Sequence, residues 1–131
     1  MSLNKIKIIK LKISPNPKGD ILKYLTRKNK YLKKFGEIYF TEIKKNKVKG
    51  WNFHKKYTCL IAVPFGKVKF TFAENINGNN KIITIGKNNY CIIMVPPRIW
   101  FNFKSITKLS LVVNTINGIH QKNETLKMSI N

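Results

Sequence analysis

Polar and apolar residues alternate with a period of two along most of this chain. The pattern is clearest in Lys5–Ile13 and in Lys67–Glu74. Because successive side chains of a strand point to opposite faces, such alternation predicts strands with one buried face. Shorter apolar runs bounded by turn residues predict further strands. They are Gly36–Ile43, Val48–His54, Tyr57–Gly66 and the segments KIITI, NYCIIMV, RIWFNF and KLSLVV.

Turn-forming residues separate these strands. Ser14–Asp20 and Asn75–Asn80 are rich in Asn, Gly or Pro, and Pro96–Pro97 interrupts two apolar runs. Ile21–Leu32 has a mixed pattern that fits either a short helix or a basic loop. Short strands with turns about every 8–12 residues indicate an all-β sandwich or barrel. The chain has neither βαβ alternation nor a glycine-rich phosphate-binding loop.

The length of 131 residues suits a single domain, residues 1–131. We divide it into an N-terminal strand and basic segment (1–35), a barrel core (36–116) and an irregular polar tail (117–131). No apolar run reaches the roughly 18 residues of a membrane span. The start lacks the apolar stretch of a signal peptide, so we expect a cytoplasmic protein. Cys59 and Cys91 lie in apolar runs and are expected to be buried, reduced thiols.

The formal net charge is +21, which favours contact with polyanions. However, nearly all the cations are lysines, and Arg27 and Arg98 are the only arginines. Base-contacting proteins favour arginine, whose guanidinium group pairs with guanine at two points. The abundance of Lys, Ile and Asn also fits an AT-rich genome. We therefore favour genome composition over nucleic-acid binding as the source of the charge, and keep the latter as an alternative.

Two short motifs have the spacing of the cupins, which are small antiparallel jelly rolls. In the first cupin motif, two His are two residues apart, and an acid and a Gly follow. Here Asn52, His54, Cys59 and Gly66 hold those positions. The second motif is a Pro–x–Gly turn followed by a His. Here it reads Pro96–Pro97–Arg98, with Phe101 at the His position. The chain thus resembles a cupin-type jelly roll, also described as a double-stranded β-helix barrel.

Within the cupins, the chain resembles the metal-free sugar-nucleotide branch, which includes dTDP-4-dehydrorhamnose 3,5-epimerase and the dTDP-sugar 3,4-ketoisomerases. It is most similar to an uncharacterised subgroup related to the epimerases. The matching segments are Lys18–Gly19, Gly36–Phe40, Lys49–His54 followed by Lys55 and Lys56, Val95–Trp100, and His120 with Glu124.

The resemblance implies a nucleotide-sugar ligand, no cofactor and no metal, since at most His54 and Cys59 remain of the metal ligands. Several family residues are replaced. Asn52 stands at the base position, Cys59 at that of an enolate-stabilising Lys, and Val112 or Val113 at that of the acid Tyr. The family's base-orienting Asp lies in a C-terminal segment that we expect this shorter chain to lack.

His54 is the best remaining base, because a neutral imidazole suits proton transfer near neutral pH. Tyr39 and Glu37 are candidate helpers. The residues expected to bind substrate are Lys18, Lys49, Asn52, Cys59, Arg98 and Trp100. We expect His120, in the polar tail, to be solvated or at an interface.

Three functions remain open. The first is isomerisation or epimerisation of a nucleotide-diphosphate sugar for surface-polysaccharide synthesis, by a homodimer joined through the strand Ile6–Ile13. The second is a basic nucleic-acid-binding module, and the third is a ligand-binding cupin without catalysis.

Overall fold

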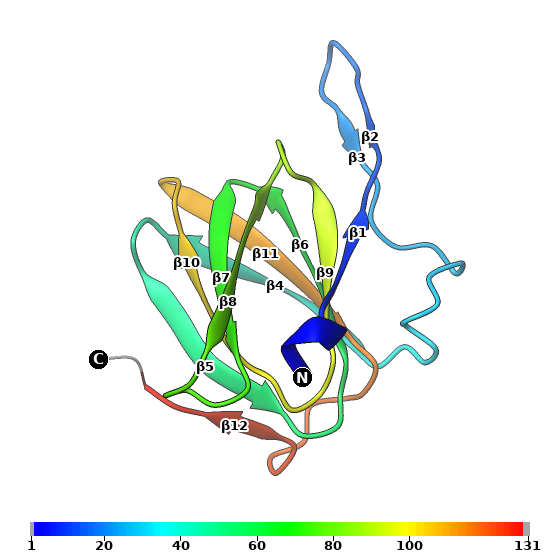
Figure 1. Cartoon of the computed structure of the whole chain (residues 1–131). Helices are drawn as coiled ribbons and strands as arrows, with labels where there is room; N and C mark the ends of the chain where they lie inside the picture. Colours follow the sequence, from blue (N-terminus) through cyan, green and yellow to red (C-terminus); the bar gives the residue numbers. More distant parts are fainter. Residues whose placement is uncertain (1, 130–131) are drawn as a thin grey trace.

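Two antiparallel five-stranded sheets face each other in the computed structural model, which describes residues 2–129 (Figure 1). The first sheet has the order β1-β9-β6-β11-β4. Its strands are β1 (Lys7–Lys10), β9 (Cys91–Val95), β6 (Cys59–Phe65), β11 (Leu109–Ile116) and β4 (Glu37–Lys44). This sandwich is the all-β jelly roll predicted from the strand pattern and the cupin motifs.

The second sheet has the order β12-β5-β10-β7-β8. Its strands are β12 (Thr125–Lys127), β5 (Val48–His54), β10 (Trp100–Ser105), β7 (Lys67–Ala73) and β8 (Asn80–Gly86). A two-stranded hairpin of β2 (Ile13–Ser14) and β3 (Ile21–Leu22) projects from the body, and a 3₁₀ helix spans Ser2–Lys5. Within the described residues, no helix is long and apolar enough to cross a membrane.

The main hydrophobic core fills one side of the space between the sheets. Strand alternation places the apolar residues of β6, β7, β8 and β9 there, as the period-two pattern predicts. Phe70 and Phe72 of β7 are fully buried and stack with ring centroids 6.1 Å apart. These residues fill the interior on this side of the sandwich with closely packed apolar side chains.

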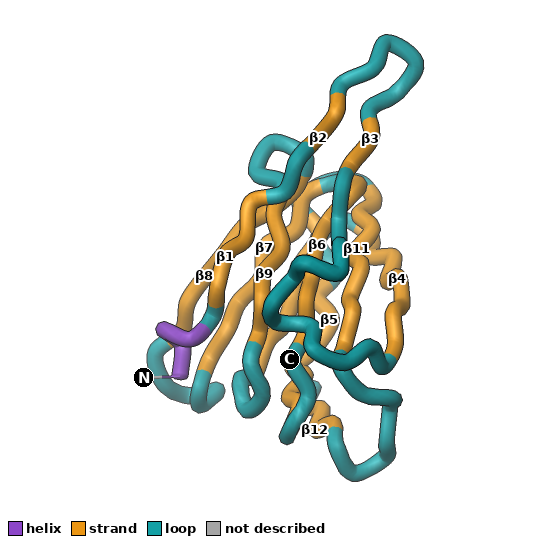
Figure 2. Tube along the Cα trace, turned by 90° about the vertical axis from the view of Figure 1, so that its right-hand side faces the viewer, coloured by secondary structure: helices purple, strands orange, loops and turns teal. Residues whose placement is uncertain are grey.

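The segment after β3 is a basic loop, which is one of the two alternatives that the mixed pattern of Ile21–Leu32 left open. It has no regular secondary structure, and its apolar side chains pack on the outer face of the first sheet (Figure 2). Tyr24 donates a hydrogen bond to the carbonyl oxygen of Leu60 at 2.8 Å. The basic segment therefore covers a second, smaller apolar cluster around Leu60, Ile92 and Met94.

The polar tail is also more ordered than expected. Thr125–Lys127 form β12, which pairs with β5 in the register Thr125 to His54 and Lys127 to Asn52. This pairing brings a segment distant in sequence to the edge of the second sheet, beside the open side of the interior.

Candidate functional site

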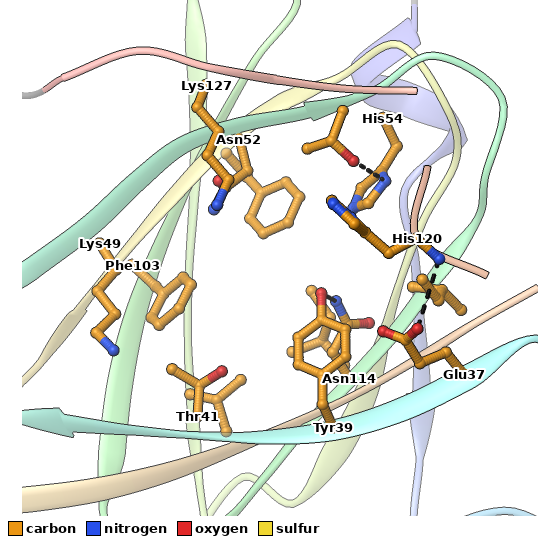
Figure 3. Close-up of a pocket in the computed structure, with 15 residues that line it drawn as sticks. Glu37, Tyr39, Thr41, Lys49, Asn52, His54, Phe103, Asn114, His120 and Lys127 are labelled. Atoms are coloured by element: carbon orange, nitrogen blue, oxygen red, sulfur yellow. Dashed lines mark hydrogen bonds between the residues drawn. The ribbon is translucent and has the colours of Figure 1, made fainter. Parts of the chain in front are cut away.

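A cavity of about 420 Å³ lies between β4 and β11 of one sheet and β5, β10 and β12 of the other. Its volume is within the usual range for small-molecule sites. The lining residues are Glu37, Tyr39, Thr41, Lys49, Asn52, His54, Ile61, Phe101, Phe103, Val112, Asn114, Ile116, His120, Thr125 and Lys127. The polar ones come from both sheets and from the tail, and they converge on the same space (Figure 3).

His54 is buried at the end of β5, and its ring reaches into the cavity. Its Nδ1 lies 2.7 Å from Oε1 of Glu124. Because the carboxylate can only accept, this bond places the proton of a neutral imidazole on Nδ1 and leaves Nε2 free to take up another. The pair therefore has the arrangement of an oriented general base.

Glu124 is itself fixed by several donors. Its Oε2 accepts hydrogen bonds from the backbone N–H groups of Lys56 at 3.2 Å and Tyr57 at 3.1 Å, and Thr125 Oγ1 donates to its Oε1 at 2.9 Å. Burial alone would raise the pKa of this carboxyl group, but the hydrogen bonds, led by that from His54, hold its pKa below the ordinary value. Glu124 is therefore an ionised, immobile partner for the imidazole near neutral pH.

Tyr39 lies across the cavity from His54, on β4 (Figure 3). Its hydroxyl oxygen accepts a hydrogen bond from Nδ2 of Asn114 at 3.1 Å, so the hydroxyl proton is directed elsewhere. Burial raises the pKa of Tyr39 to about 12, and the phenol stays protonated at neutral pH. A proton donor and a proton acceptor thus occupy opposite walls.

A bulge in β5 places Lys49 in the same cavity. Phe101 pairs with Asn52 and Phe103 with Lys49, so β5 has one residue more than β10 between these pairs. Gly50 adopts φ +112° there, and a Cβ atom would lie 2.7 Å from the carbonyl oxygen of Phe101. The bulge lets Lys49 and Asn52, three residues apart, share the interior face.

Glu37 and His120 meet at the rim of the cavity. The backbone N–H of His120 donates to Oε2 of Glu37 at 3.4 Å. His120 was expected to be solvated or at an interface, and it is exposed, but it also lines the cavity. In the described part of the chain, no group of three His, Cys, Asp or Glu side chains is placed to hold a metal ion.

No sequence-family profile and no curated protein sequence matches this chain. Solved structures do match it. A dTDP-sugar isomerase from Desulfovibrio desulfuricans G20 superimposes with a TM-score of 0.88 at 27% identity, over 95% of this chain and 83% of that one. The sugar 3,4-ketoisomerase QdtA from Thermoanaerobacterium thermosaccharolyticum, solved with TDP, gives 0.79 at 18% identity, over 95% and 88%.

The epimerase RmlC from Legionella pneumophila Philadelphia 1, solved with dTDP-4-keto-L-rhamnose, gives a TM-score of 0.81 at 13% identity, over 98% of this chain and 74% of that one. These matches agree with the resemblance seen in the motifs. The chain has the cupin fold and is similar in structure to dTDP-sugar isomerases and epimerases.

The structure brings together five of the residues that the sequence singled out in this cupin. Glu37, Tyr39, Lys49, Asn52 and His54 all line the cavity. Their roles in binding or catalysis remain predictions.

The other four expected site residues do not line the cavity. Cys59 is fully buried in the main core, and burial raises the pKa of its thiol to about 12. Trp100 packs against Phe53 with the two rings tilted and their centroids 4.8 Å apart, and the guanidinium carbon of Arg98 lies 5.5 Å from the centroid of the Phe53 ring. Lys18 is exposed in the projecting β2–β3 hairpin.

Alternation along β10 explains the position of Trp100. Phe101 points into the cavity, so its neighbour Trp100 must face the other side of the sheet. The sequence left open which of the two lines the mouth.

Glu124 is the residue that sequence reasoning missed. The resemblance predicts that this chain lacks the segment with the family's orienting carboxylate, but the tail supplies a carboxylate that is hydrogen-bonded to His54. The signal in the sequence is the spacing of His120 and Glu124, which forms part of the resemblance to the uncharacterised subgroup.

Proposed function

We propose that this cupin binds a dTDP-linked keto sugar and isomerises or epimerises it by proton transfer, without a cofactor. The observation that carries the proposal is the contact of 2.7 Å between His54 Nδ1 and Glu124 Oε1 at the wall of the cavity. The ligand class is suggested by the structural relatives, whose complexes contain TDP and dTDP-4-keto-L-rhamnose.

In this proposal His54 is the base. Its free Nε2 removes a proton from the carbon beside the keto group. The electron pair of the broken C–H bond forms a C=C bond, and the π pair of the C=O bond moves to the keto oxygen to give an enolate. Glu124 stabilises the imidazolium cation that results, because it is ionised and hydrogen-bonded to Nδ1.

Tyr39 is the acid on the opposite wall. Its hydroxyl donates a proton to the enolate, at a carbon or at an oxygen, and is reprotonated from water. Glu37 at the rim is a second candidate for this relay. Delivery to the same carbon from the wall opposite His54 would invert that centre. To move the keto group instead, protonation of the oxygen gives an enediol, the former carbonyl carbon then takes a proton, and the neighbouring hydroxyl loses its own proton to become the new keto group.

Lys49, Asn52 and Lys127 supply the charge and hydrogen bonds for the substrate. Both lysines line the cavity, where an ammonium group stabilises a diphosphate or a developing enolate. The amide of Asn52 can donate to a sugar oxygen but cannot act as a base near neutral pH.

We also propose a setting for this activity. The protein would act as a homodimer in the cytoplasm, in the synthesis of surface polysaccharide. The exposed edge of the first sheet at β1 (Lys7–Lys10) supports the dimer, since an unpaired strand edge can extend a partner's sheet. The free thiols of Cys59 and Cys91 are consistent with a reducing compartment.

Deuterium exchange tests the proposal directly. The protein is incubated in deuterium oxide with dTDP-4-keto-6-deoxyglucose, and incorporation at carbons beside the keto group is followed by NMR. We expect exchange with the wild type, and a loss of about 100-fold or more in His54→Gln, which removes the base.

The binding of dTDP distinguishes this proposal from its alternatives. Thermal shifts with dTDP should be equal in the wild type and His54→Gln, because the base does not bind the nucleotide. Binding of dTDP without any exchange by the wild type would indicate a non-catalytic cupin. Absence of both would refute the proposed function.

A further inference from the structure

Three turns gather at the end of the sandwich away from His54 and Glu124. They are the β4–β5 turn (44–48), the β6–β7 turn (65–67) and the β10–β11 turn (105–109), at the upper left of Figure 1. We call these three turns together the basic end. Strand β5 separates it from His54 by about 20 Å, at roughly 3.3 Å for each residue.

Hydrogen bonds join the three turns to one another. Lys45 N donates to the carbonyl oxygen of Lys108 at 3.0 Å, and Asn46 N donates to that of Ser105 at 3.0 Å. Ile106 N donates to the carbonyl oxygen of Lys67 at 2.8 Å. The basic end is therefore a preorganised surface rather than three independent loops, and ordering it on binding costs little.

Apolar side chains are exposed at its centre. Phe65 at the tip of the β6–β7 turn is 61% exposed, and Ile106 and Leu109 are 39% and 38% exposed. A shallow groove runs between Phe65 and Leu109, with Lys44, Lys45 and Lys108 among its lining residues. Exposed apolar side chains that cluster on a rigid surface and are bordered by polar residues mark an interaction site.

Lysines surround this apolar centre. The three turns carry Lys44, Lys45, Lys47, Lys67 and Lys108, and their sequences contain no Asp or Glu. All five lysines are exposed. The surface therefore combines lysines, whose charge no acidic residue of the three turns neutralises, with exposed apolar side chains.

We propose that the basic end docks on the surface of an anionic lipid bilayer. Phe65, Ile106 and Leu109 would insert among the acyl chains near the headgroups, and the five lysines would contact anionic headgroups, as in proteins that bind at membrane interfaces. Nucleic acid fits this surface less well, because it is bound through its phosphates and by stacking of its bases on aromatic rings. The branched apolar side chains of Ile106 and Leu109 can make neither contact.

Docking in this orientation leaves the candidate active site free. The end of β5 that carries His54 and the strand β12 that follows Glu124 lie at the other end of the sheets, away from the surface that would meet the lipid (Figure 1). The protein could therefore bind a membrane while its cavity stays accessible to substrate. Membrane binding would occur whether or not the protein catalyses the proposed reaction.

Vesicle co-sedimentation of the full chain is the test. The vesicles are phosphatidylcholine alone or with about 30% phosphatidylserine, at about 0.1 M salt. We expect binding only to the anionic vesicles. Each lysine near the surface contributes about fivefold, so the triple variant Lys44→Gln, Lys45→Gln, Lys108→Gln should bind roughly 100-fold more weakly. Phe65→Ser should lose about tenfold through lost apolar burial.

Matched variants elsewhere control for net charge and hydrophobicity. Lys28→Gln, Lys33→Gln, Lys34→Gln removes the same charge from the N-terminal segment, and Phe35→Ser removes a phenylalanine of similar exposure, 63%, at the other end of β4. Both should stay within about twofold of wild type, since only the basic end meets the lipid.

Three results would overturn the proposal. The first is no binding of the wild type to anionic vesicles. The second is an equal loss in the two lysine triples, which would show a response to total charge alone. The third is a combination of two observations. The lysine triple variant of the basic end binds a short DNA duplex more weakly than the wild type does, and Phe65→Ser leaves vesicle binding unchanged. Together they would make the basic end a nucleic-acid site.

Discussion

The two sides of the space between the sheets are built by the same strand alternation but differ in content. Between β6, β7, β8 and β9 the inward positions are apolar, and Phe70, Ile85 and Ile93 are at most 1% exposed. Between β4, β5, β11 and β12 many inward positions are polar, and a cavity of about 420 Å³ remains. We call these the packed side and the open side.

The difference shows how one fold divides stability and chemistry. On β7 the inward residues are Val68, Phe70 and Phe72, whereas on β4 they begin with Glu37 and Tyr39. The open side also carries a cost, because Oδ1 of Asn114 is buried without a hydrogen-bond partner among the described residues. The apolar burial on the packed side must therefore offset the loss of folding stability that the polar groups of the open side cause.

The largest expected effect is on the packed side. Ile93→Ala should lower the free energy of unfolding by about 2–5 kcal/mol, because it leaves a cavity in a closely packed core. Urea denaturation measures this, with Ile82→Ala as a control that should cost less than about 1 kcal/mol because Ile82 is 56% exposed. Residual activity at low temperature should be near normal, and a large loss of activity in the folded variant would contradict the division between the sides.

Tyr39→Phe tests the open side. Removal of the proposed acid should lower the rate of product formation about 100- to 1000-fold, while the free energy of unfolding changes little. Because the pKa of Tyr39 is about 12, the phenol stays protonated at pH 10. The wild-type rate should therefore not fall near pH 10 through ionisation of Tyr39. An unchanged rate in this variant would exclude Tyr39 as the acid.

Glu124→Gln should affect both stability and chemistry. The pKa of Glu124 is below its ordinary value in the folded state, so its ionised form stabilises the fold above pH 4.5 and this contribution is lost as pH falls through the folded pKa. We expect a cost of about 1–3 kcal/mol near pH 7, typical of a lost charged hydrogen bond, and this cost should shrink as the pH falls below 4.5. Denaturation at pH 7 and at pH 3.5 measures the difference, and a cost independent of pH would contradict this assignment.

Lys49→Gln has the smallest expected effect. Lys49 is exposed at the rim of the cavity, so its loss should weaken dTDP binding by about tenfold with little change in stability. Calorimetry measures the affinity, and Lys47→Gln, two residues away and outside the cavity lining, is the matched control. Equal losses in the two variants would show that only the general charge matters.

The sequence was sufficient for most of the fold, because alternation is a local signal. The inward faces of β4 and β7 follow directly from their period of two, and Asn52 and His54 were correctly placed on one face. The segment after Leu22 was left open because its apolar residues pack on the outside of a sheet without helical or strand periodicity.

The site was only partly predictable, because two of its features depend on long-range contacts. Lys49 enters the cavity through the bulge at Gly50, for which a single glycine is weak evidence. Glu124 reaches His54 through a pairing across 70 residues, from a tail whose polar sequence predicts no strand. Spacing rules cannot show which distant carboxylate meets a given imidazole.

The segment that carries Glu124 has a consequence for how the protein responds to heat. Strand β12 has three residues, and the residues between β11 and Glu124 are largely exposed. Such segments open at a lower free energy than a packed core does. Warming should therefore detach this carboxylate together with β12 while the other strands of the two sheets remain paired, so that inactivation precedes melting and reverses on cooling.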